Sequence, residues 1–315
     1  MLRTLRSRAV LCRHARALST ASTRPTSINV LGKDYPTDDY TNVTPTILSK
    51  LTANLHKQQG HPLHTLRSLI ERTYPTFSSL SPDTPLVTTY QNFDSLSFSP
   101  DHPGRSASDS YYVNRDLLLR THTSAHEVEV FARGEDRWLL FADVYRRDEI
   151  DASHYPAFHQ TEGARIFSTD PSGIREIEED NARMEAELAV ANIIIEDIPH
   201  LSKANPHQPQ HDPRHAALVA QNLKLSLNAL MLNLFGGRTR PGADRGEPLR
   251  VRWIEAYFPF TSPSYEVEVF FGGDWLEILG CGVIQQATLD NASQFSFFLL
   301  YPRLANFLSQ RCLIS

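Results

Sequence analysis

The sequence predicts an α+β domain in which an antiparallel sheet is flanked by helices. Residues 138–145 form an apolar, β-type run, a polar loop containing Pro156 follows, and a second apolar run begins at Phe158. Helical patterns then separate this pair of strands from a second group, which is typical of an α+β domain. The second group has the pattern of an antiparallel meander, and its strands are predicted over residues 252–258, 265–271 and 275–280.

The helices are predicted from apolar stripes and their capping residues. Thr44 before Pro45 has the pattern of an N-cap followed by proline in the first turn. A short helix is also predicted over residues 124–132, next to the polar cluster described below. The longer helices are predicted over residues 44–60, 62–74, 174–195 and 214–235.

Residues 1–33 have the composition of a mitochondrial presequence. They contain six arginines and one lysine, and no acidic residue precedes Asp34. A disordered basic arm that binds RNA would have a similar composition, but the arginines interleave with apolar residues, which favours the presequence. We therefore expect residues 1–33 to be disordered and to be removed on import, with a plausible cleavage context before Ser19.

The remaining chain is acidic. The 31 basic and 36 acidic residues give a net charge of −5, and without the five arginines of residues 1–18 the balance is 26 against 36, or −10. This excludes a strongly basic binder of nucleic acid. Three cysteines allow neither a disulfide framework nor a four-thiolate zinc site, and the histidine spacing predicts no metal site. No apolar run is long enough to span a membrane.

A polar cluster surrounds the first predicted strand pair, from Arg120 to Glu162. Arg146 leaves the first strand, and Gln160 and Glu162 lie two apart in the second, so their side chains share a face. A guanidinium that faces polar acceptors is suited to bind a zwitterion together with a phosphate. A salt-bridged surface hairpin uses the same residue types, and spacing alone does not decide between the two.

Several strings in this region resemble one family. HTSAH, DVYRRD and FHQTEG, followed downstream by RWIEAYFPFTSPS and WLEILGCGV, are similar to class II phenylalanyl-tRNA synthetase in its single-chain mitochondrial form. The resemblance extends in order over about residues 90–283. It implies a class II antiparallel sheet flanked by helices. It also implies that phenylalanine is activated with ATP and Mg²⁺ and transferred to phenylalanine tRNA in the mitochondrial matrix, by a monomer that needs no zinc, DNA or membrane.

The resemblance also assigns residues. Arg146 is the implied catalytic residue, which grips the α-phosphate and the substrate carboxylate. The other implied ATP-binding residues are Asp148, Ser153, His154 and Tyr155. The implied amino-acid-binding residues are His122, Ser124, Ala125, His126, Glu127, Gln160, Thr161, Glu162, Phe258, Phe260 and Glu277. Phe258 and Phe260, two apart on one predicted strand, are expected to contact the substrate ring. Glu127 stands where the family usually has Gln, so its role is less defined.

The resemblance stops after about Ala292. The catalytic core is therefore expected over residues 34–292, without the family's Gly-rich third motif and without its anticodon-binding domain. Residues 293–315 are apolar and are expected to be either a divergent terminal helix or the result of a frame change or truncated gene model. Two functions follow from this: a phenylalanine–tRNA ligase, impaired as written, or a non-catalytic synthetase-derived binding module.

Overall fold

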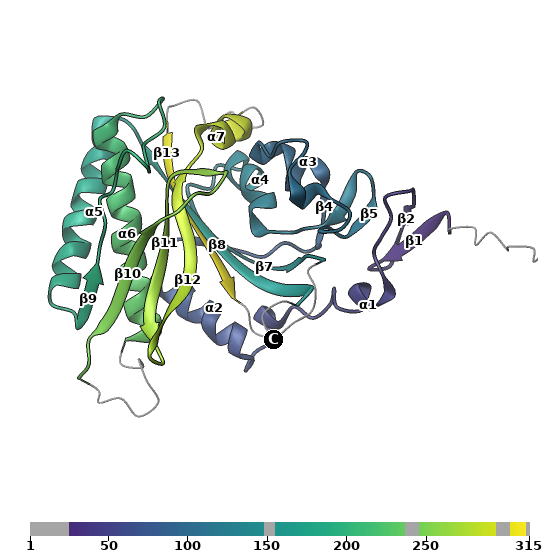
Figure 1. Ribbon diagram of the computed structural model, residues 1–315, viewed down its shortest axis with the longest axis horizontal. Coiled ribbons are helices and arrows are strands. Elements are labelled where there is room, and N and C mark those ends of the chain that lie inside the picture. Colours follow the sequence, from purple (N-terminus) through teal and green to yellow (C-terminus); the bar gives the residue numbers. More distant parts are fainter. Residues whose placement is uncertain (1–24, 148–154, 237–245, 294–302, 313–315) are drawn as a thin grey trace, which may run out of the picture.

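The computed structural model describes residues 25–147, 155–236, 246–293 and 303–312. Its centre is an eight-stranded sheet with the order β3-β7-β8-β13-β12-β11-β10-β9 (Figure 1). Neighbouring strands are antiparallel, except that β3 pairs with β7 and β9 pairs with β10 in parallel. The strand bounds are β3 Ser78–Leu80, β7 Arg137–Tyr145, β8 Ala157–Ser168, β9 Ile193–Glu196, β10 Leu249–Glu255, β11 Thr261–Phe271, β12 Asp274–Ile284 and β13 Arg303–Cys312.

The predicted hairpin is confirmed. β7 pairs with β8 in antiparallel register, with Ala142 opposite Gln160 and Leu140 opposite Glu162. The predicted meander is confirmed as β10, β11 and β12. Gly272 has a φ of 64°, a left-handed conformation that glycine adopts at no steric cost, and it makes the tight turn between β11 and β12.

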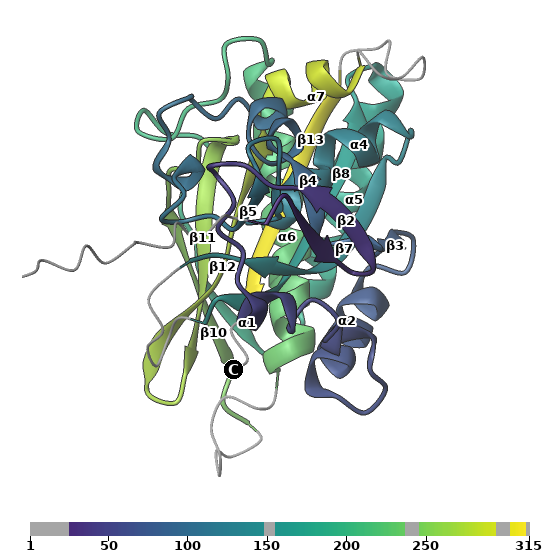
Figure 2. The ribbon, with the colours of Figure 1, turned by 90° about the vertical axis from the view of Figure 1, so that its right-hand side faces the viewer.

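Helices cover both faces of the sheet, as the α+β class predicts (Figures 1 and 2). Against one face, α2 (Pro62–Thr73), α5 (Pro171–Ala189) and α6 (Pro213–Phe235) contribute to a core that includes Trp253 and Tyr265. Against the other, α4 (Glu127–Ala132) and α7 (Gln286–Ser293) pack around the β7–β8 hairpin. Within the described part of the chain, no helix is both long and apolar enough to cross a bilayer.

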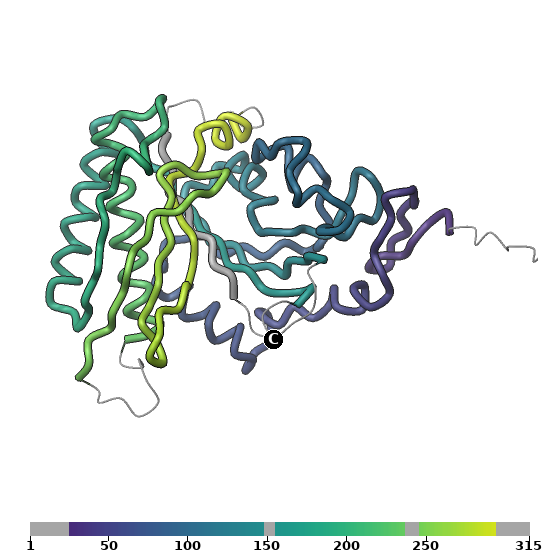
Figure 3. Tube along the Cα trace, viewed as in Figure 1, coloured from purple at the N-terminus to yellow at the C-terminus, as the bar shows by residue number. Residues whose placement is uncertain are grey.

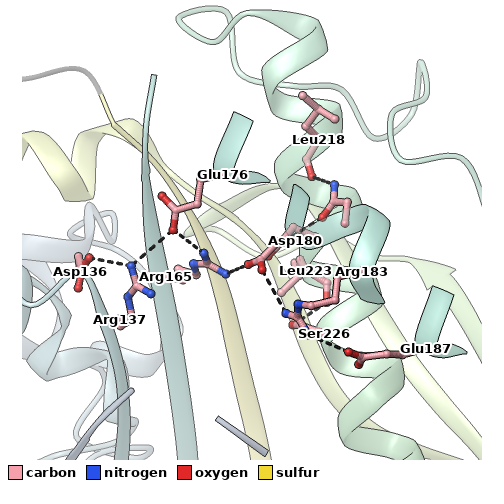
Figure 4. A network of polar contacts seen from close by, with 12 residues as sticks. Asp136, Arg137, Arg165, Glu176, Asp180, Arg183, Glu187, Leu218, Leu223 and Ser226 are labelled. Carbon is pink, nitrogen blue, oxygen red and sulfur yellow. Dashed lines mark hydrogen bonds and ion pairs between the residues drawn. The ribbon is translucent and has the colours of Figure 1, made fainter. Parts of the chain in front are cut away.

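Ion pairs reinforce the contact between β8 and the helices of the first face. Arg165 of β8 contacts Glu176 at 2.8 Å and Asp180 at 2.5 Å, both on α5, and Asp180 also binds Arg183 at 3.1 Å (Figure 4). Asn181 extends the polar contacts to α6 by donating to the Leu218 carbonyl at 3.1 Å. These bonds fix α5 across the strand that carries Gln160 and Glu162.

A smaller layer lies at the end of the molecule away from α5 and α6. It holds a three-stranded sheet, short helical turns and the β1–β2 hairpin, and its purple and blue trace lies on the right in Figure 3. Residues 93–124 of this layer lie over the β7–β8 hairpin. Tyr145 of β7 packs into the core of the small layer. Its elements are β1 Ser27–Val30, β2 Lys33–Pro36, α1 Pro45–Leu48, β4 Leu86–Thr88, α3 Thr89–Asn92, η2 Asp94–Leu96, η3 Pro103–Arg105, β5 Tyr112–Asn114, β6 Leu117–Leu119 and η4 Thr123–His126. The turn η1 (Leu55–Lys57) packs instead against α2.

Disorder over the whole of residues 1–33 was a wrong prediction. Strand β1 pairs with β2, and Val30 is 1% exposed in the core of the small layer. Residues 1–24 lie outside the described residues. The arginine-rich composition ends before this hairpin, so composition alone set the boundary too late.

Two helix predictions extended too far. The Thr44 cap is confirmed, because its hydroxyl accepts from the Ile47 N–H, but α1 ends at Leu48. Asn54 then has a left-handed φ of 41°, and its N–H bonds Asp143 across the fold. At the end of α5, residues 193–196 leave the helix and form β9, since β-branched isoleucines pair with β10. The helices predicted over 62–74, 124–132 and 214–235 are confirmed as α2, as η4 with α4, and as α6.

The expectation of a terminal helix was also wrong. Residues 303–312 form β13, which hydrogen-bonds to β8 on one side and to β12 on the other. A short apolar run is compatible with either a buried helix or a central strand. Here the run lies between β8 and β12, whose backbone groups it pairs with, and this position makes it a strand. Residues 294–302 and 313–315 lie outside the described residues.

Candidate functional site

A cavity of about 680 Å³ lies between the small layer, the β7–β8 hairpin and the β11–β12 side of the sheet. One wall is polar and the other is aromatic and apolar. Its lining residues are Phe93, Phe98, His102, Gly104, Asp109, Ser110, Thr121, His122, Ser124, Arg146, Gln160, Phe258, Pro259, Phe260, Glu277, Ile278, Leu279 and Gly280.

The hairpin contributes a cation and an amide to the polar wall. The Arg146 Nε donates to the Thr121 carbonyl at 2.9 Å, and the guanidinium lies 5.4 Å from the Phe158 ring centroid. The Gln160 Oε1 accepts from the Thr123 N–H at 3.2 Å. Both side chains are therefore held by the segment that lies over the hairpin. The predicted convergence of Arg146 and Gln160 on one space is confirmed by their shared cavity.

His122 supplies a neutral imidazole to the same wall. Its ring stacks on Phe98 with a centroid distance of 5.7 Å and an interplanar angle of 7°. Burial lowers the pKa of His122 to about 4, and His126 and His102 add to the effect, while the Asn92 backbone opposes it. Neither ring nitrogen has a hydrogen-bond partner of normal geometry among the described residues. The ring is thus uncharged at neutral pH and has one donor and one acceptor to offer a ligand.

Ser124 connects the cavity to a buried carboxyl group. It lines the cavity, and its hydroxyl donates to Glu162 Oε2 at 2.8 Å. The Thr123 hydroxyl donates to the same oxygen at 2.5 Å. Glu162 is fully buried and does not line the cavity, and among the described side chains Ser124 links it to the cavity.

The aromatic wall is built around Phe98. Its ring contacts Phe93, His102 and Phe260 with centroid distances of 5.8, 4.5 and 5.5 Å. Sequence reasoning missed Phe98 and His102, which lie in a loop-rich segment where no periodic pattern distinguishes lining residues from core residues.

Phe258 and Phe260 line the cavity, but they do not lie on a strand as predicted. β10 ends at Glu255, and the two rings project from the connection to β11. The Phe258 ring occupies the space above Gly280 of β12, where an added Cβ would lie 2.5 Å from the ring. Only glycine at position 280 leaves room for this ring position.

The other predicted residues divide into three groups. Glu277 lines the cavity from β12. The buried residues that do not line it are Ala125, His126, Glu127, Thr161 and Glu162. Thr161 follows Gln160 in β8 and so faces the opposite side of the sheet, next to α2. Tyr155 lies away from the cavity with its ring 4.9 Å from the Lys50 Nζ. Asp148, Ser153 and His154 lie outside the described residues.

A buried triad of His56, Asp143 and His159 behind the hairpin was not foreseen. Its candidate ligand atoms all lie within 4.8 Å of one another. The His159 Nδ1 is 2.6 Å from Asp143 Oδ1, and the His56 Nδ1 is 3.3 Å from the same oxygen. Two ligands of one tetrahedral ion with bonds of about 2.0–2.1 Å would stand roughly 3.3 Å apart. The shorter contact is therefore a hydrogen bond, which ties β7 to the residue before Gln160.

The family comparison agrees with this fold and site. Residues 47–168 and 215–297 match the family described as the tRNA synthetases class II core domain (F). The chain belongs to this family. The α+β core, with its antiparallel sheet between helices, is that of a class II synthetase, and the matched segments contain the β7–β8 hairpin and the β10–β12 meander.

Individual relatives of this class II core are longer. Mitochondrial phenylalanine–tRNA ligase of Rattus norvegicus is 39% identical over 277 residues, which cover 84% of this chain and 53% of the relative. The Saccharomyces cerevisiae protein of that name is 41% identical over 290 residues, covering 83% and 62%. Among solved structures, pyrrolysyl-tRNA synthetase from Desulfitobacterium hafniense is similar with a TM-score of 0.45 at 13% identity, covering 84% of this chain and 71% of that one. The chain thus spans between half and two thirds of these ligases' length.

Proposed function

We propose that this class II core binds L-phenylalanine and activates it with ATP to phenylalanyl-adenylate, for transfer to the 3′ end of phenylalanine tRNA. The observation that carries the proposal is the cavity with an arginine, a neutral imidazole and a hydroxyl on one wall and phenylalanine rings on the other. Similar proteins are named mitochondrial phenylalanine–tRNA ligases, which supports the same substrate class.

The chemistry requires little beyond charge and alignment. The substrate carboxylate attacks the α-phosphorus of ATP, forming a carboxyl–phosphate bond as pyrophosphate leaves, so two anionic groups must approach each other. Arg146 supplies a permanent cation and a planar set of donors for both groups. Because its Nε is held by the Thr121 carbonyl, the guanidinium is oriented before the substrates arrive.

The ammonium group belongs on the Ser124 and Gln160 side of the cavity. Glu162 supplies negative charge beneath Ser124, and the Gln160 amide lies beside it. His122, held neutral by burial, adds no repelling positive charge and offers a hydrogen bond instead. Exposed Glu277 on the rim contributes further negative potential.

The substrate ring belongs against Phe258 and Phe260. Edge-to-face contacts of this kind are worth about 0.5–1.5 kcal/mol beyond burial. A tyrosine hydroxyl placed there would lose its water without gaining a partner. Rejection of an added hydroxyl by an apolar pocket is about 100-fold, so weak tyrosine activation is expected.

The wider assignments follow the same resemblance. ATP enters as its Mg²⁺ complex, with Mg²⁺ arriving on the phosphates rather than in a protein site. Asp148, Ser153 and His154 contact the nucleotide, whereas Tyr155, whose ring lies against the Lys50 Nζ, takes no part in that contact. The protein acts as a monomer in the mitochondrial matrix after the presequence is removed, with a plausible cleavage context before Ser19, and it binds neither DNA nor membrane.

Two measurements on the 315-residue chain test the proposal: equilibrium binding of phenylalanine and phenylalanine-dependent ATP–pyrophosphate exchange. Saturable binding with exchange that depends on phenylalanine supports it. Binding without exchange supports instead a non-catalytic binding module. Absence of phenylalanine binding by a folded chain refutes the amino-acid site.

A further inference from the structure

Two carboxyl groups lie beneath the part of the cavity wall that Ser124 forms. Glu127, at the start of α4, is 1% exposed, and Glu162, on β8, is 0% exposed. Neither lines the cavity. Two buried acids in contact are rare without a cation or a proton to relieve their repulsion.

The hydrogen bonds around the pair leave one oxygen of each carboxyl group without a donor. Thr123 and Ser124 both donate to Glu162 Oε2. Glu162 Oε1 and Glu127 Oε2 are buried and have no donor among the described residues. The two side chains nevertheless lie within hydrogen-bonding reach of each other. A hydrogen bond between two carboxyl groups requires that one of them carries a proton.

We propose that Glu127 and Glu162 hold one proton between them, carried by Glu127, and that the pair positions Ser124 to accept a hydrogen bond from a cationic group in the cavity. Glu127 donates to Glu162 Oε1, and Glu162 remains the anion. Because the single hydroxyl proton of Ser124 is directed to Glu162, its oxygen can act only as an acceptor toward the cavity. The second part rests on the proposed function, since phenylalanine brings the ammonium group.

The electrostatics of the site agree with this arrangement. Burial raises the pKa of Glu127 well above its usual range, and the neighbouring Glu162 raises it further. Burial also raises the pKa of Glu162, but the Thr123 and Ser124 hydroxyls and the hydrogen bond with Glu127 oppose the rise. Glu162, whose charged form accepts hydrogen bonds from two hydroxyl groups, is therefore the first of the two carboxyl groups to lose its proton as the pH rises.

Among the side chains that the structure describes, the nearest ionisable groups on the surrounding elements are engaged elsewhere. His126 contacts Arg120 at 2.9 Å and Glu129 at 3.7 Å, and His122 stacks on Phe98. On α7, which packs against α4, Asp290 is exposed and bonded to Gln286. In the strands beside β8, Glu162 has Leu140 and Ser309 as register partners, and Arg311 stands opposite Gln160.

The first test measures unfolding by urea between pH 5 and 7 for the wild type, Glu127→Gln and the surface control Glu247→Gln. A carboxyl whose pKa is raised in the folded state contributes full stability below its unfolded pKa of about 4.5 and loses it as pH rises toward the folded pKa. Each retained proton makes the folded-to-unfolded ratio fall about tenfold per pH unit in that window. The folded wild type retains one proton more than folded Glu127→Gln, because in the variant the glutamine amide donates the hydrogen bond that protonated Glu127 donates in the wild type.

The expected result is therefore a wild-type slope steeper than that of Glu127→Gln by about tenfold per pH unit. Glu247→Gln should keep the wild-type slope, because Glu247 is exposed in the folded chain and its surroundings change little on unfolding. Infrared spectra at pH 7 should contain a protonated-carboxyl band that only Glu127→Gln loses. Equal slopes for all three chains, or no such band in the wild type, overturn the shared proton.

The second test asks whether Ser124 accepts a hydrogen bond from the ammonium group. It compares the binding of phenylalanine with the binding of its analogue without the amino group. Glu162→Gln should reduce the preference for phenylalanine by about tenfold or more, the scale of one hydrogen bond to a charged group. An unchanged preference overturns the positioning role. If the wild type binds neither compound, the proposed function fails while the slopes and the infrared band still decide the shared proton.

Discussion

Replacing Gly280 with alanine should selectively damage the aromatic side of the cavity. The added Cβ would lie 2.5, 2.8 and 3.3 Å from three carbons of the Phe258 ring. Carbon atoms in good contact stand about 3.5–4.0 Å apart, so the ring must move by roughly 1 Å. Phe258 lies in a connection rather than in a strand, and the ring can shift without breaking a backbone ladder.

The expected magnitude follows from overpacking. Inserting one methyl group into a well-packed site costs about 1–3 kcal/mol. If the displaced ring occupies substrate space, this corresponds to a loss of about 5- to 150-fold in phenylalanine affinity. Equilibrium dialysis with phenylalanine measures the loss, and thermal unfolding checks that the fold is retained.

Two variants make the test specific. Gly246→Ala is the matched control, because an added Cβ there meets nothing within 4 Å and affinity should be unchanged. In a Phe258→Ala background, Gly280→Ala should have little further effect, since the ring that it displaces is gone. Wild-type affinity in Gly280→Ala, or the same loss with and without the Phe258 ring, would refute the role given to this contact.

Three further predictions concern the polar wall, the buried triad and the leader. Arg146→Ala should lower the rate of ATP–pyrophosphate exchange by about 100-fold or more, because one charge-stabilising donor is lost. The surface variant Arg133→Ala is the control and should exchange at the wild-type rate. Equal rates for the two variants would contradict the role of Arg146. Burial would raise the pKa of Asp143, but the hydrogen bond from His159 and the neighbouring His56 imidazole hold that pKa well below its usual value of 3.8. The contribution of Asp143 to stability is therefore present above pH 3.8 and is lost as the pH falls below it. Asp143→Asn should therefore cost about 1–3 kcal/mol at neutral pH in urea unfolding and show a weaker loss in acid, and parallel acid profiles would count against the triad. N-terminal sequencing of the protein recovered from mitochondria should show that the arginine-rich leader is removed, with Ser19 as the expected first residue, and an N-terminus still at Met1 would disprove the presequence.

Local patterns in the sequence determined much of the scaffold. Alternation and apolar runs identified the β7–β8 hairpin and the β10–β12 meander, because the period-two geometry of a strand is imposed residue by residue. Capping chemistry located the start of α1, because the Thr44 hydroxyl and Pro45 act on neighbouring residues of the chain. The motif strings around Arg146 and Gln160 were sufficient to indicate the family and the residues of the polar wall.

Tertiary structure alone decided which side chains share the cavity and which elements complete the sheet. β13 fills the position between β8 and β12 because unpaired backbone groups on both sides require a partner, and an apolar run does not specify helix or strand by itself. The contact between Glu127 and Glu162 joins residues 35 positions apart on different elements, so no local pattern encodes it. Phe98 entered the site in the same way, through the packing of a loop over a sheet. Local geometry is set by short-range sterics and hydrogen bonds, whereas the site depends on long-range packing of surfaces that the linear sequence keeps apart.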